Sequence, residues 1–299
     1  KNPVLLSSGQ FVWEKGLLSI VSMGVGSWTF GLNYLAGAPD TGLGKGFDWT
    51  QNAHLEELVN GDVDLVTGEN TRERFVNQGG GSYSSESNQS AAILTRSGSG
   101  TNDRFTLISS PGNTSLFFGF DAAIATPGRI KSITDRHGNT QSFSWRRVGG
   151  VDQLATLTDG YGRQIVYRYY GSEKGHRLSE IEDFLGRKLN FQYDDAGHLT
   201  AVVTPSITKA LEGDTFPGGT AYVFQYDTAN PRTDRRDDLI RIWYPNQATS
   251  FIDTATRAVD VASVYAQATP RYEVEYGQDP MDEDHYGKVV SETLGDPDN

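Results

Sequence analysis

Cysteine is missing from this chain of 299 residues, and only two methionines and five histidines are present. The missing thiols exclude a disulfide framework and any metal site that needs thiolate ligands. The histidines never occur at His-x-x-x-His spacing, so the sequence carries no sign of a helical zinc site. It also lacks a glycine-rich phosphate loop and a Gly-x-Ser-x-Gly turn, which argues against phosphate-loop nucleotide binding and against a hydrolase nucleophile.

Basic residues are scarce as well. Lysine and arginine number 26 against 38 aspartates and glutamates, which gives a formal net charge of −12 at pH 7. Sequence-independent binding to nucleic acid needs a basic track that releases counterions from the phosphates. We therefore do not expect nucleic acid as a partner.

Long hydrophobic runs are absent, and the nearest approach is the segment from Gly16 to Ala38, which carries no formal charge. A membrane helix needs about 20 predominantly apolar residues, whereas Gly24, Gly26, Gly31 and several serine, threonine and asparagine side chains interrupt this segment. We predict two buried strands around a glycine bend here, and no membrane span. No signal peptide is visible in the chain, but one could lie upstream of Lys1.

What the sequence does contain is a repeat with a spacing of 24 residues and no gaps. In each copy two apolar residues three positions apart are followed by Asp and then, three residues later, by Gly. A fixed period of this length is typical of stacked supersecondary units. The repeat turn residues are Asp135 and Gly138, Asp159 and Gly162, and Asp183 and Gly186.

A pair of aromatic residues follows each repeat glycine after five and seven positions. Side chains at i and i+2 lie on one face of a strand, and Asp-x-x-Gly is typical of a turn whose Asp accepts backbone hydrogen bonds. One repeat is therefore predicted to be an antiparallel hairpin, and neighbouring hairpins to form a continuous sheet, because a lone hairpin is marginally stable. The repeat aromatics are Phe143 and Trp145, Tyr167 and Tyr169, and Phe191 and Tyr193.

The repeats occupy only part of the chain, which we divide into two predicted regions. Residues 1–100 are predicted to be a β-rich lead-in with a Gly/Ser-rich loop at 78–100, with the alternative that one sheet continues across this stretch. Residues 101–299 are predicted to be the β-hairpin array, with the clearest repeats at 128–204. The period loosens after Leu199, and we expect the insertion at 206–220 to change the unit length. Helical periodicity is scarce, and 52–59 is predicted to be a loop or a short helical turn.

The repeat resembles the tyrosine/aspartate (YD) repeat of RHS proteins. Its likeness is carried by Gly128-Arg129-Ile130, Asp135-x-x-Gly138-Asn139, Gly175-x-Arg177-Leu178, Asp183-x-x-Gly186-Arg187 and Phe191-Gln192-Tyr193-Asp194-x-x-Gly197-x-Leu199. The family's lead-in is resembled by Asn2-Pro3-Val4, Leu32-Asn33-Tyr34 and Gly42-Leu43-Gly44-x-Gly46-Phe47-x-Trp49. The chain departs from the family pattern where Asn33-Tyr34 is inverted and the arginine usual before this motif is absent.

The resemblance implies an all-β fold in which consecutive antiparallel β-hairpins form a long curved or spiralling sheet, as in RHS shells. Such shells enclose a C-terminal toxin or other cargo in exported bacterial proteins. The resemblance thus implies an extracellular or cell-surface location, and as partners the rest of the parent chain and its cargo. Self-cleaving members end the shell with Asp-Pro-x-Gly, which residues 295–299 approach only with Asn in place of Gly. No protease role, catalytic residue or cofactor is therefore assigned.

Two further groups of residues could carry chemistry. The acidic residues Asp279, Asp282, Glu283 and Asp284 could bind Ca²⁺ weakly, but they lack the Asp-x-Asp-x-Asp-Gly pattern, and we prefer a solvated acidic loop. The histidines His137, His176, His198 and His285 are interpreted as solvated turn residues and not as acid–base groups.

The repeat residues themselves are given structural roles. The aspartates are interpreted as turn formers, and the aromatics as a cross-strand ladder; the alternative is a sugar-stacking platform that includes Trp145 and Trp243. Our leading hypothesis is a structural, non-enzymatic shell segment that encloses cargo or builds a surface assembly. The alternatives are an adhesive or fibre-forming module that binds glycans or neighbouring copies, and a self-cleaving protease fragment.

Overall fold

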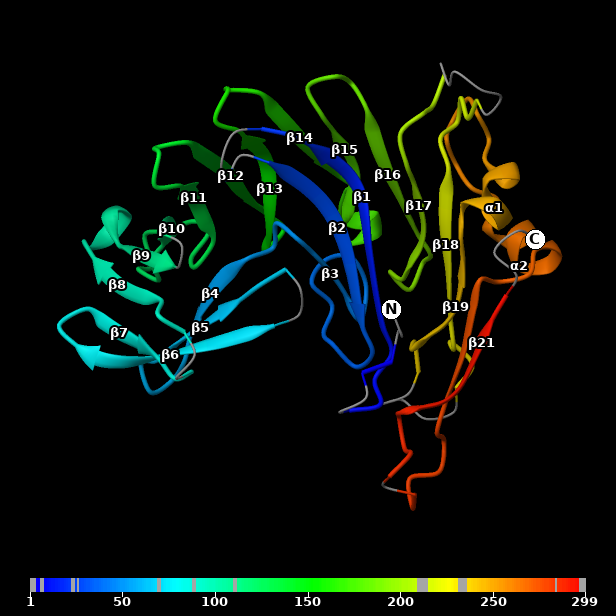
Figure 1. Cartoon of the computed structure of the whole chain (residues 1–299), viewed down its shortest axis with the longest axis horizontal. Helices are drawn as coiled ribbons and strands as arrows, with labels where there is room; N and C mark the ends of the chain where they lie inside the picture. Colours follow the sequence, from blue (N-terminus) through cyan, green and yellow to red (C-terminus); the bar gives the residue numbers. More distant parts are fainter. Residues whose placement is uncertain are drawn as a thin grey trace. The chain divides into compact units, whose positions relative to one another are not determined.

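A computed structural model shows that the regular secondary structure of the chain is mainly β-strand (Figure 1). The structure describes every residue except 1–3, 6–7, 23–24, 26, 69–70, 88–89, 110–111, 209–214, 231–235, 283 and 296–299. Eighteen strands, β4 to β21, form a long antiparallel sheet in chain order, and β1, β2 and β3 form a second, three-stranded sheet. The predicted all-β class and the consecutive antiparallel hairpins are confirmed.

The chain groups into two compact units, each built from discontinuous segments. Unit 1 comprises residues 1–18, 32–48 and 169–299, and unit 2 comprises residues 19–31 and 49–168. These units do not follow the predicted regions 1–100 and 101–299, since each unit contains parts of both regions. β1 (Val12–Ile20), β2 (Trp28–Leu35) and β3 (Phe47–Trp49) contribute residues to both units.

The two strands predicted within residues 16–38 are confirmed as β1 and β2. Trp28, Phe30 and Leu32 of β2 are fully buried, so the uncharged run supplies core residues. In the described part of the chain, no helix has the length and apolar character to cross a bilayer.

Unit 2 is a meander of hairpins whose strands bury alternate side chains. Its strands are β4 (His54–Glu57), β5 (Val63–Val66), β6 (Arg72–Gly79), β7 (Ser82–Ser85), β8 (Ile93–Ser97), β9 (Arg104–Ser109), β10 (Asn113–Phe118), β11 (Ile130–Thr134), β12 (Thr140–Val148), β13 (Val151–Thr158) and β14 (Gln164–Tyr169). Phe75 of β6, Leu94 of β8 and Phe105 of β9 are fully buried.

Two local predictions in this unit are wrong. The Gly/Ser-rich stretch at 78–100 contains β7 and β8, and the stretch at 52–59 contains β4. Gly79 to Gly81 have positive φ and make the tight turn between β6 and β7, so they do not belong to a linker. Tyr83 is buried while Ser82 and Ser84 are exposed, which is the period-2 pattern of a strand with one wet face.

Unit 1 contains a meander of its own, formed by β15 (Leu178–Glu182), β16 (Lys188–Tyr193), β17 (Leu199–Val203), β18 (Ala221–Tyr226), β19 (Leu239–Trp243), β20 (Tyr272–Tyr276) and β21 (Val289–Leu294). The insertion predicted at 206–220 lies between β17 and β18. Its residues 209–214 are outside the described part, and Ile207 and Phe216 form an isolated antiparallel bridge. A second insertion, between β19 and β20, was not predicted.

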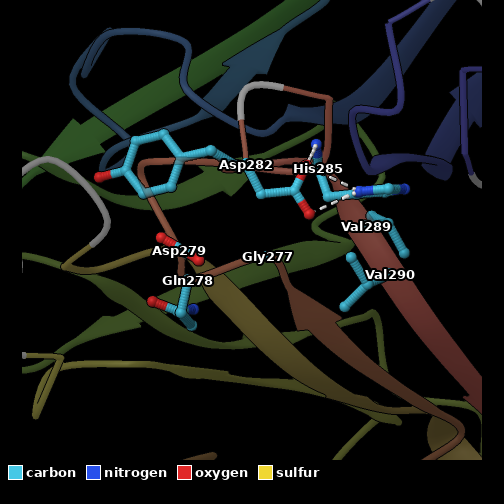
Figure 2. Close-up of a pocket in the computed structure, with 8 residues that line it drawn as sticks. Gly277, Gln278, Asp279, Asp282, His285, Val289 and Val290 are labelled. Carbon is cyan, nitrogen blue, oxygen red and sulfur yellow. Dashed lines mark hydrogen bonds and ion pairs between the residues drawn. The ribbon is translucent and has the colours of Figure 1, made fainter.

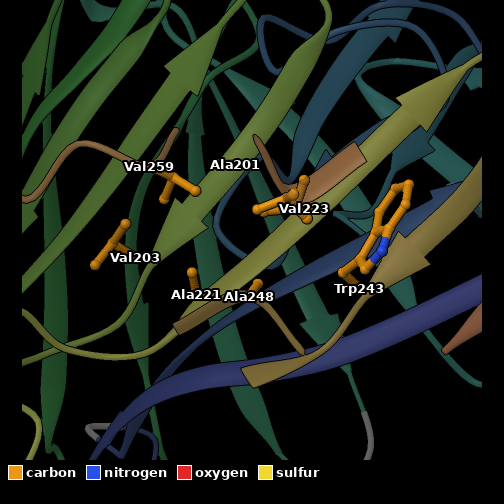
Figure 3. Close-up of a cluster of buried hydrophobic side chains, with 8 residues drawn as sticks. Ala201, Val203, Ala221, Val223, Trp243, Ala248 and Val259 are labelled. Atoms are coloured by element: carbon orange, nitrogen blue, oxygen red, sulfur yellow. The ribbon is translucent and has the colours of Figure 1, made fainter. Parts of the chain in front are cut away.

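This second insertion carries two short helices, α1 (Pro245–Ala248) and α2 (Val261–Gln267). They cover β17, β18 and β19 with a small apolar cluster, drawn in Figure 3. As a result β18 is buried on both faces. The cluster consists of Ala201, Val203, Ala221, Val223, Trp243, Ala248, Val259 and Val264.

A register shift recurs at the second aromatic position of the hairpins. In β12, Ser144 pairs with Thr156 and Trp145 pairs with Leu154, so Ala155 is an extra residue in β13. This β-bulge places Leu154 and Leu157, which are three positions apart, on the same buried face. Equivalent shifts occur at Leu116/Phe117, Gln192/Tyr193, Gln225/Tyr226 and Glu275/Tyr276.

Candidate functional site: the repeat turns and the loops fastened to them

Each repeat aspartate closes its turn with both carboxylate oxygens. In the third repeat, Asp183 Oδ1 accepts the backbone N–H groups of Leu185 at 2.8 Å and Arg187 at 2.9 Å. Arg187 Nε donates to Asp183 Oδ2 at 2.6 Å, and the Gly186 N–H donates to the Asp183 carbonyl. Gly186 has φ +75°, a conformation that glycine adopts without steric cost.

The same pattern recurs in the other two copies. Asp135 Oδ2 accepts from Asn139 Nδ2 at 2.8 Å, and Asp159 Oδ2 accepts from Arg163 Nε at 2.7 Å. The Asn139 hydrogen bond holds the pKa of Asp135 below its usual value. Gly138 and Gly162 have φ of +86° and +78°. Because the turn itself engages both oxygens of each carboxylate, these aspartates are poorly placed to act on a substrate.

The repeat aromatics face the interior to different degrees. Phe143, Tyr167, Phe191 and Tyr193 are buried, whereas Trp145 and Tyr169 are half-buried. Trp145 Nε1 donates to the Ile130 carbonyl at 2.7 Å, and Tyr167 Oη accepts from Trp28 Nε1 at 3.2 Å. The alternative that placed Trp243 on a sugar-stacking surface is wrong, because this side chain is 1% exposed within the apolar cluster.

A fourth turn of the same kind, at Asp194, is completed by a histidine. His198 Nδ1 lies 2.7 Å from Asp194 Oδ2, and its Nε2 lies 3.3 Å from Asp237 Oδ1. The imidazole is buried and stacks on Tyr226 with ring centroids 4.7 Å apart. The interpretation of His198 as a solvated residue is therefore wrong. Its position four residues after the aspartate, where the repeats have Asn139, Arg163 and Arg187, is the signal that could have identified it.

The other three histidines interpreted as solvated turn residues lie closer to solvent. His137 is exposed and accepts a hydrogen bond from Arg136 Nε at 3.1 Å, and His176 is half-buried with φ +57°. His285 is exposed, and its Nδ1 lies 2.8 Å from Asp282 Oδ2. These three residues belong to separate loops and turns of the chain.

The glycine-rich lead-in loop is fastened to the start of β15. Asp40 Oδ1 accepts the N–H groups of Gly42 at 2.8 Å and Gly44 at 3.0 Å, and Arg177 donates to both carboxylate oxygens at 3.1 and 2.7 Å. Burial alone would raise the pKa of Asp40, but the hydrogen bonds from Arg177 and the loop lower it below its ordinary value. The lead-in motif thus serves as an anchor within unit 1.

We expect Gly46→Ala to destabilise this anchor by about 2–4 kcal/mol. Gly46 has φ +82°, and an added Cβ would lie 2.4 Å from Cε2 of Tyr34, whose hydroxyl accepts the Leu239 N–H. Gly42→Ala is the matched control, since Gly42 also has a positive φ but no atom within 4 Å of the added Cβ. The free energy of unfolding in urea is measured for both variants, and the difference between them gives the cost of the clash with Tyr34. Equal losses of stability in the two variants would contradict the prediction.

Unit 2 has a comparable anchor at the buried carboxylate of Asp103. Arg96 donates to Asp103 Oδ1 through Nε at 2.9 Å and to Oδ2 through Nη2 at 2.8 Å, while the N–H groups of Phe120 and Asp121 also donate to Oδ2. The Arg96 hydrogen bond lowers the pKa of Asp103, against the opposing effect of burial.

This lowered pKa predicts a specific acid response. The stabilisation by Asp103 is fully present above the pKa of an unfolded aspartate, about 3.9, and is lost as the pH falls through the lower folded-state value. We expect Asp103→Asn to be less stable than the parent at pH 7, with the difference shrinking towards pH 3. Thermal unfolding of both proteins from pH 7 to pH 3 tests this, and parallel curves would contradict it.

Two of the four acidic residues near the C-terminus, Asp279 and Asp282, line an open pocket of about 580 Å³ (Figure 2). Asp279 and Asp282 border it together with Gln278, Tyr286 and Val289. Hydrogen bonding to His285 lowers the pKa of Asp282. Within the described residues, no group of three or more acidic or histidine side chains is arranged to hold a metal ion. Glu283 and the segment 296–299 of the Asp-Pro motif lie outside the described residues.

Comparison with known proteins finds similarity in structure but not in sequence. No family model matches the chain, and no curated protein matches it. The N-terminal domain of effector protein SpvB from Salmonella typhimurium strain LT2 is 10% identical with a TM-score of 0.45, covering 77% of this chain and 97% of that one. The TcdB2-TccC3 structure is 12% identical with a TM-score of 0.45, covering 90% of this chain but 16% of that one.

The structure of TcdB2-TccC3-Cdc42 gives similar values, with 12% identity and a TM-score of 0.44. It covers 90% of this chain, which spans 16% of that chain's length. At these sequence identities the similarity concerns the fold alone, and it does not extend to activity or partners.

Proposed function

We propose that this chain is a structural, non-enzymatic segment of a shell in an exported bacterial protein, and that its sheet encloses cargo carried by the parent chain. The observation that carries the proposal is how the repeat uses its residues. The aspartates, glycines and following polar residues are engaged in turns, and the aromatics lie in buried or half-buried seams. Such a unit supplies a wall and leaves few groups for chemistry.

The recurring bulges support the curved form of this wall. A bulge bends its strand and increases the local twist, and here it occurs in five hairpins at equivalent positions. A bend repeated in the same sense accumulates from hairpin to hairpin. We propose that this accumulation allows a long sheet of such repeats to curve around a lumen.

Proteolysis of the parent protein tests whether the sheet encloses cargo. The test uses the region that follows this chain in its open reading frame. Its digestion by a non-specific protease under native conditions is compared in two settings, within the parent protein and as an isolated polypeptide. We expect much slower digestion of this region within the parent protein. Equal digestion rates in the two settings would overturn enclosure.

The non-enzymatic part of the proposal has a separate test. The intact mass of the purified chain is measured before and after prolonged incubation at neutral and mildly acidic pH. We expect no change in mass, and a discrete internal cleavage would favour the self-cleaving alternative.

A further inference from the structure

The turn between β4 and β5 contains the only Asn-Gly step of the chain, Asn60-Gly61. Asn60 is exposed at the tip of the turn, next to the fully exposed Val59. The Gly61 N–H donates to the Leu58 carbonyl, and the Leu58 N–H donates to the Asp62 carbonyl, both at 2.9 Å. Gly61 has φ +84°, so this residue allows the chain to reverse its direction here.

The side chain of Asn60 is folded over the peptide that follows it. Its Oδ1 accepts the backbone N–H of Asp62 at 3.1 Å, and its Nδ2 donates to Asp62 Oδ2 at 2.6 Å. An asparagine that accepts a hydrogen bond from the backbone two residues on closes a ring that mimics a further turn. The Cγ atom of Asn60 and the backbone nitrogen of Gly61 are both members of this ring.

We propose that Asn60 is a site of spontaneous deamidation through a succinimide. The Gly61 nitrogen loses its proton to a solvent base and bonds to Asn60 Cγ, which closes a five-membered ring. The Cγ–Nδ2 bond then breaks, and its nitrogen leaves as ammonia with a proton taken from water. A water molecule opens the ring at either carbonyl, which yields aspartate or isoaspartate and adds one negative charge to the chain.

Two features of the turn favour this reaction at Asn60. Glycine has no side chain to hinder the approach of its nitrogen, whereas the exposed Asn102 precedes the bulkier Asp103. The Asp62 N–H points at Oδ1 of Asn60, the atom on which negative charge develops during the attack, as an oxyanion donor does. The hydrogen bond of the Gly61 N–H must break first, so the conversion is slow compared with folding.

Deamidation removes a partner from a buried carboxylate. Asp62 is 9% exposed, its Oδ2 accepts from Asn60 Nδ2, and its Oδ1 accepts the backbone N–H of Asn77 in β6 at 2.9 Å. An aspartate in place of Asn60 puts a second carboxylate where the donor was, and isoaspartate also lengthens the backbone by a methylene group. A buried charge that loses its hydrogen-bond donor is costly. The turn and its contact with β6 therefore loosen after conversion.

This inference is independent of the proposed shell function, because it concerns the chemistry of a single turn in unit 2. It gives the β4–β5 hairpin, the first of the long sheet, a limited lifetime. Since a base must remove the Gly61 proton, that lifetime shortens as the pH rises.

Peptide mapping by mass spectrometry of the purified full chain, incubated for weeks at neutral and at alkaline pH, tests the reaction. We expect the peptide that contains Asn60 to acquire the mass of the aspartate form, faster at alkaline pH, with isoaspartate in the product. The peptide that contains Asn102 is the internal control, and it should convert at least about tenfold more slowly. An unconverted Asn60, or equal rates at the two residues, would overturn the inference.

Variants separate the reaction from its effect on the turn. Asn60→Ser keeps a side-chain oxygen for the Asp62 N–H but has no amide to lose, so the mass of its turn peptide should not change. Asn60→Asp carries the product from the start. We expect a non-specific protease to cut the β4–β5 turn at least about fivefold faster in Asn60→Asp than in the fresh parent, because cleavage follows the population of opened turns.

The aged parent chain provides the last comparison. Anion exchange separates the converted chains, which carry the additional negative charge, and circular dichroism establishes that every sample is folded. We expect the converted chains to be cut at the turn at least as fast as Asn60→Asp. If neither were cut faster than the fresh parent, the turn would not loosen and this part of the inference would be refuted.

Discussion

The variant Trp243→Ala is expected to lose about 3–5 kcal/mol of stability. The indole is fully buried between β18 and the helical insertion, where it packs on Tyr265 with ring centroids 5.2 Å apart. Its Nε1 donates to the Ala268 carbonyl at 3.0 Å, so truncation also leaves that acceptor without this donor. Urea unfolding followed by far-UV circular dichroism measures the loss in the transition of unit 1.

A matched control for this prediction is Trp145→Ala. Trp145 is half-buried and makes one comparable hydrogen bond, to the Ile130 carbonyl. We expect a smaller loss, of about 1–3 kcal/mol. If the two variants were equally stable, the apolar cluster under the insertion would not contribute as its burial implies. A loss of stability in Trp243→Ala would also lower any apparent ligand binding, so this variant is unsuited to testing sugar recognition.

The hairpin array was predictable because its signals are local. Asp-x-x-Gly specifies a turn through hydrogen bonds within five residues, as the contacts of Asp183 with Leu185 and Arg187 show. Aromatic residues at i and i+2 point to one face of a strand whatever lies opposite. The class of fold and the consecutive hairpins followed from these two patterns.

The sequence also contains a signal for the bulges, which the prediction of regular hairpins did not use. Leu154 and Leu157 are three positions apart, a spacing that a regular strand would split between its two faces. The extra residue Ala155 reconciles this spacing with the burial of both leucines. The recurrence of the three-residue spacing in every copy could therefore have predicted a bulge in each hairpin.

Other features depend on contacts between distant segments. His198 reaches Asp237, which is 39 positions away, and Asp40 meets Arg177, which is 137 positions away. No local pattern specifies such pairs. The helical insertion had one signal, because Ala201-Val202-Val203 and Ala221-Tyr222-Val223-Phe224 are uninterrupted buried runs. A strand that is apolar on both sides needs cover on its second face.

The variant Asp183→Ala is expected to destabilise the chain by about 3 kcal/mol. Asp183 is 4% exposed. Its carboxylate accepts hydrogen bonds from two backbone N–H groups and forms an ion pair with Arg187. Alanine would leave these donors in a tight turn without an acceptor. Asp183→Asn keeps an acceptor for the backbone groups and loses the charge, so we expect an intermediate loss in urea unfolding.

The first repeat provides a control that separates the effect of burial on stability from the effect of the turn's hydrogen bonds. Asp135 makes the equivalent contacts with the N–H groups of His137 and Asn139, but its turn is more exposed and its fourth-position partner is uncharged. We expect Asp135→Ala to cost about 1 kcal/mol, as for the loss of an exposed cap. If Asp183→Ala cost no more than Asp135→Ala, the ion pair of the buried carboxylate with the more exposed Arg187 would add nothing to the turn. The repeat aspartates would then be interchangeable in energy as well as in geometry.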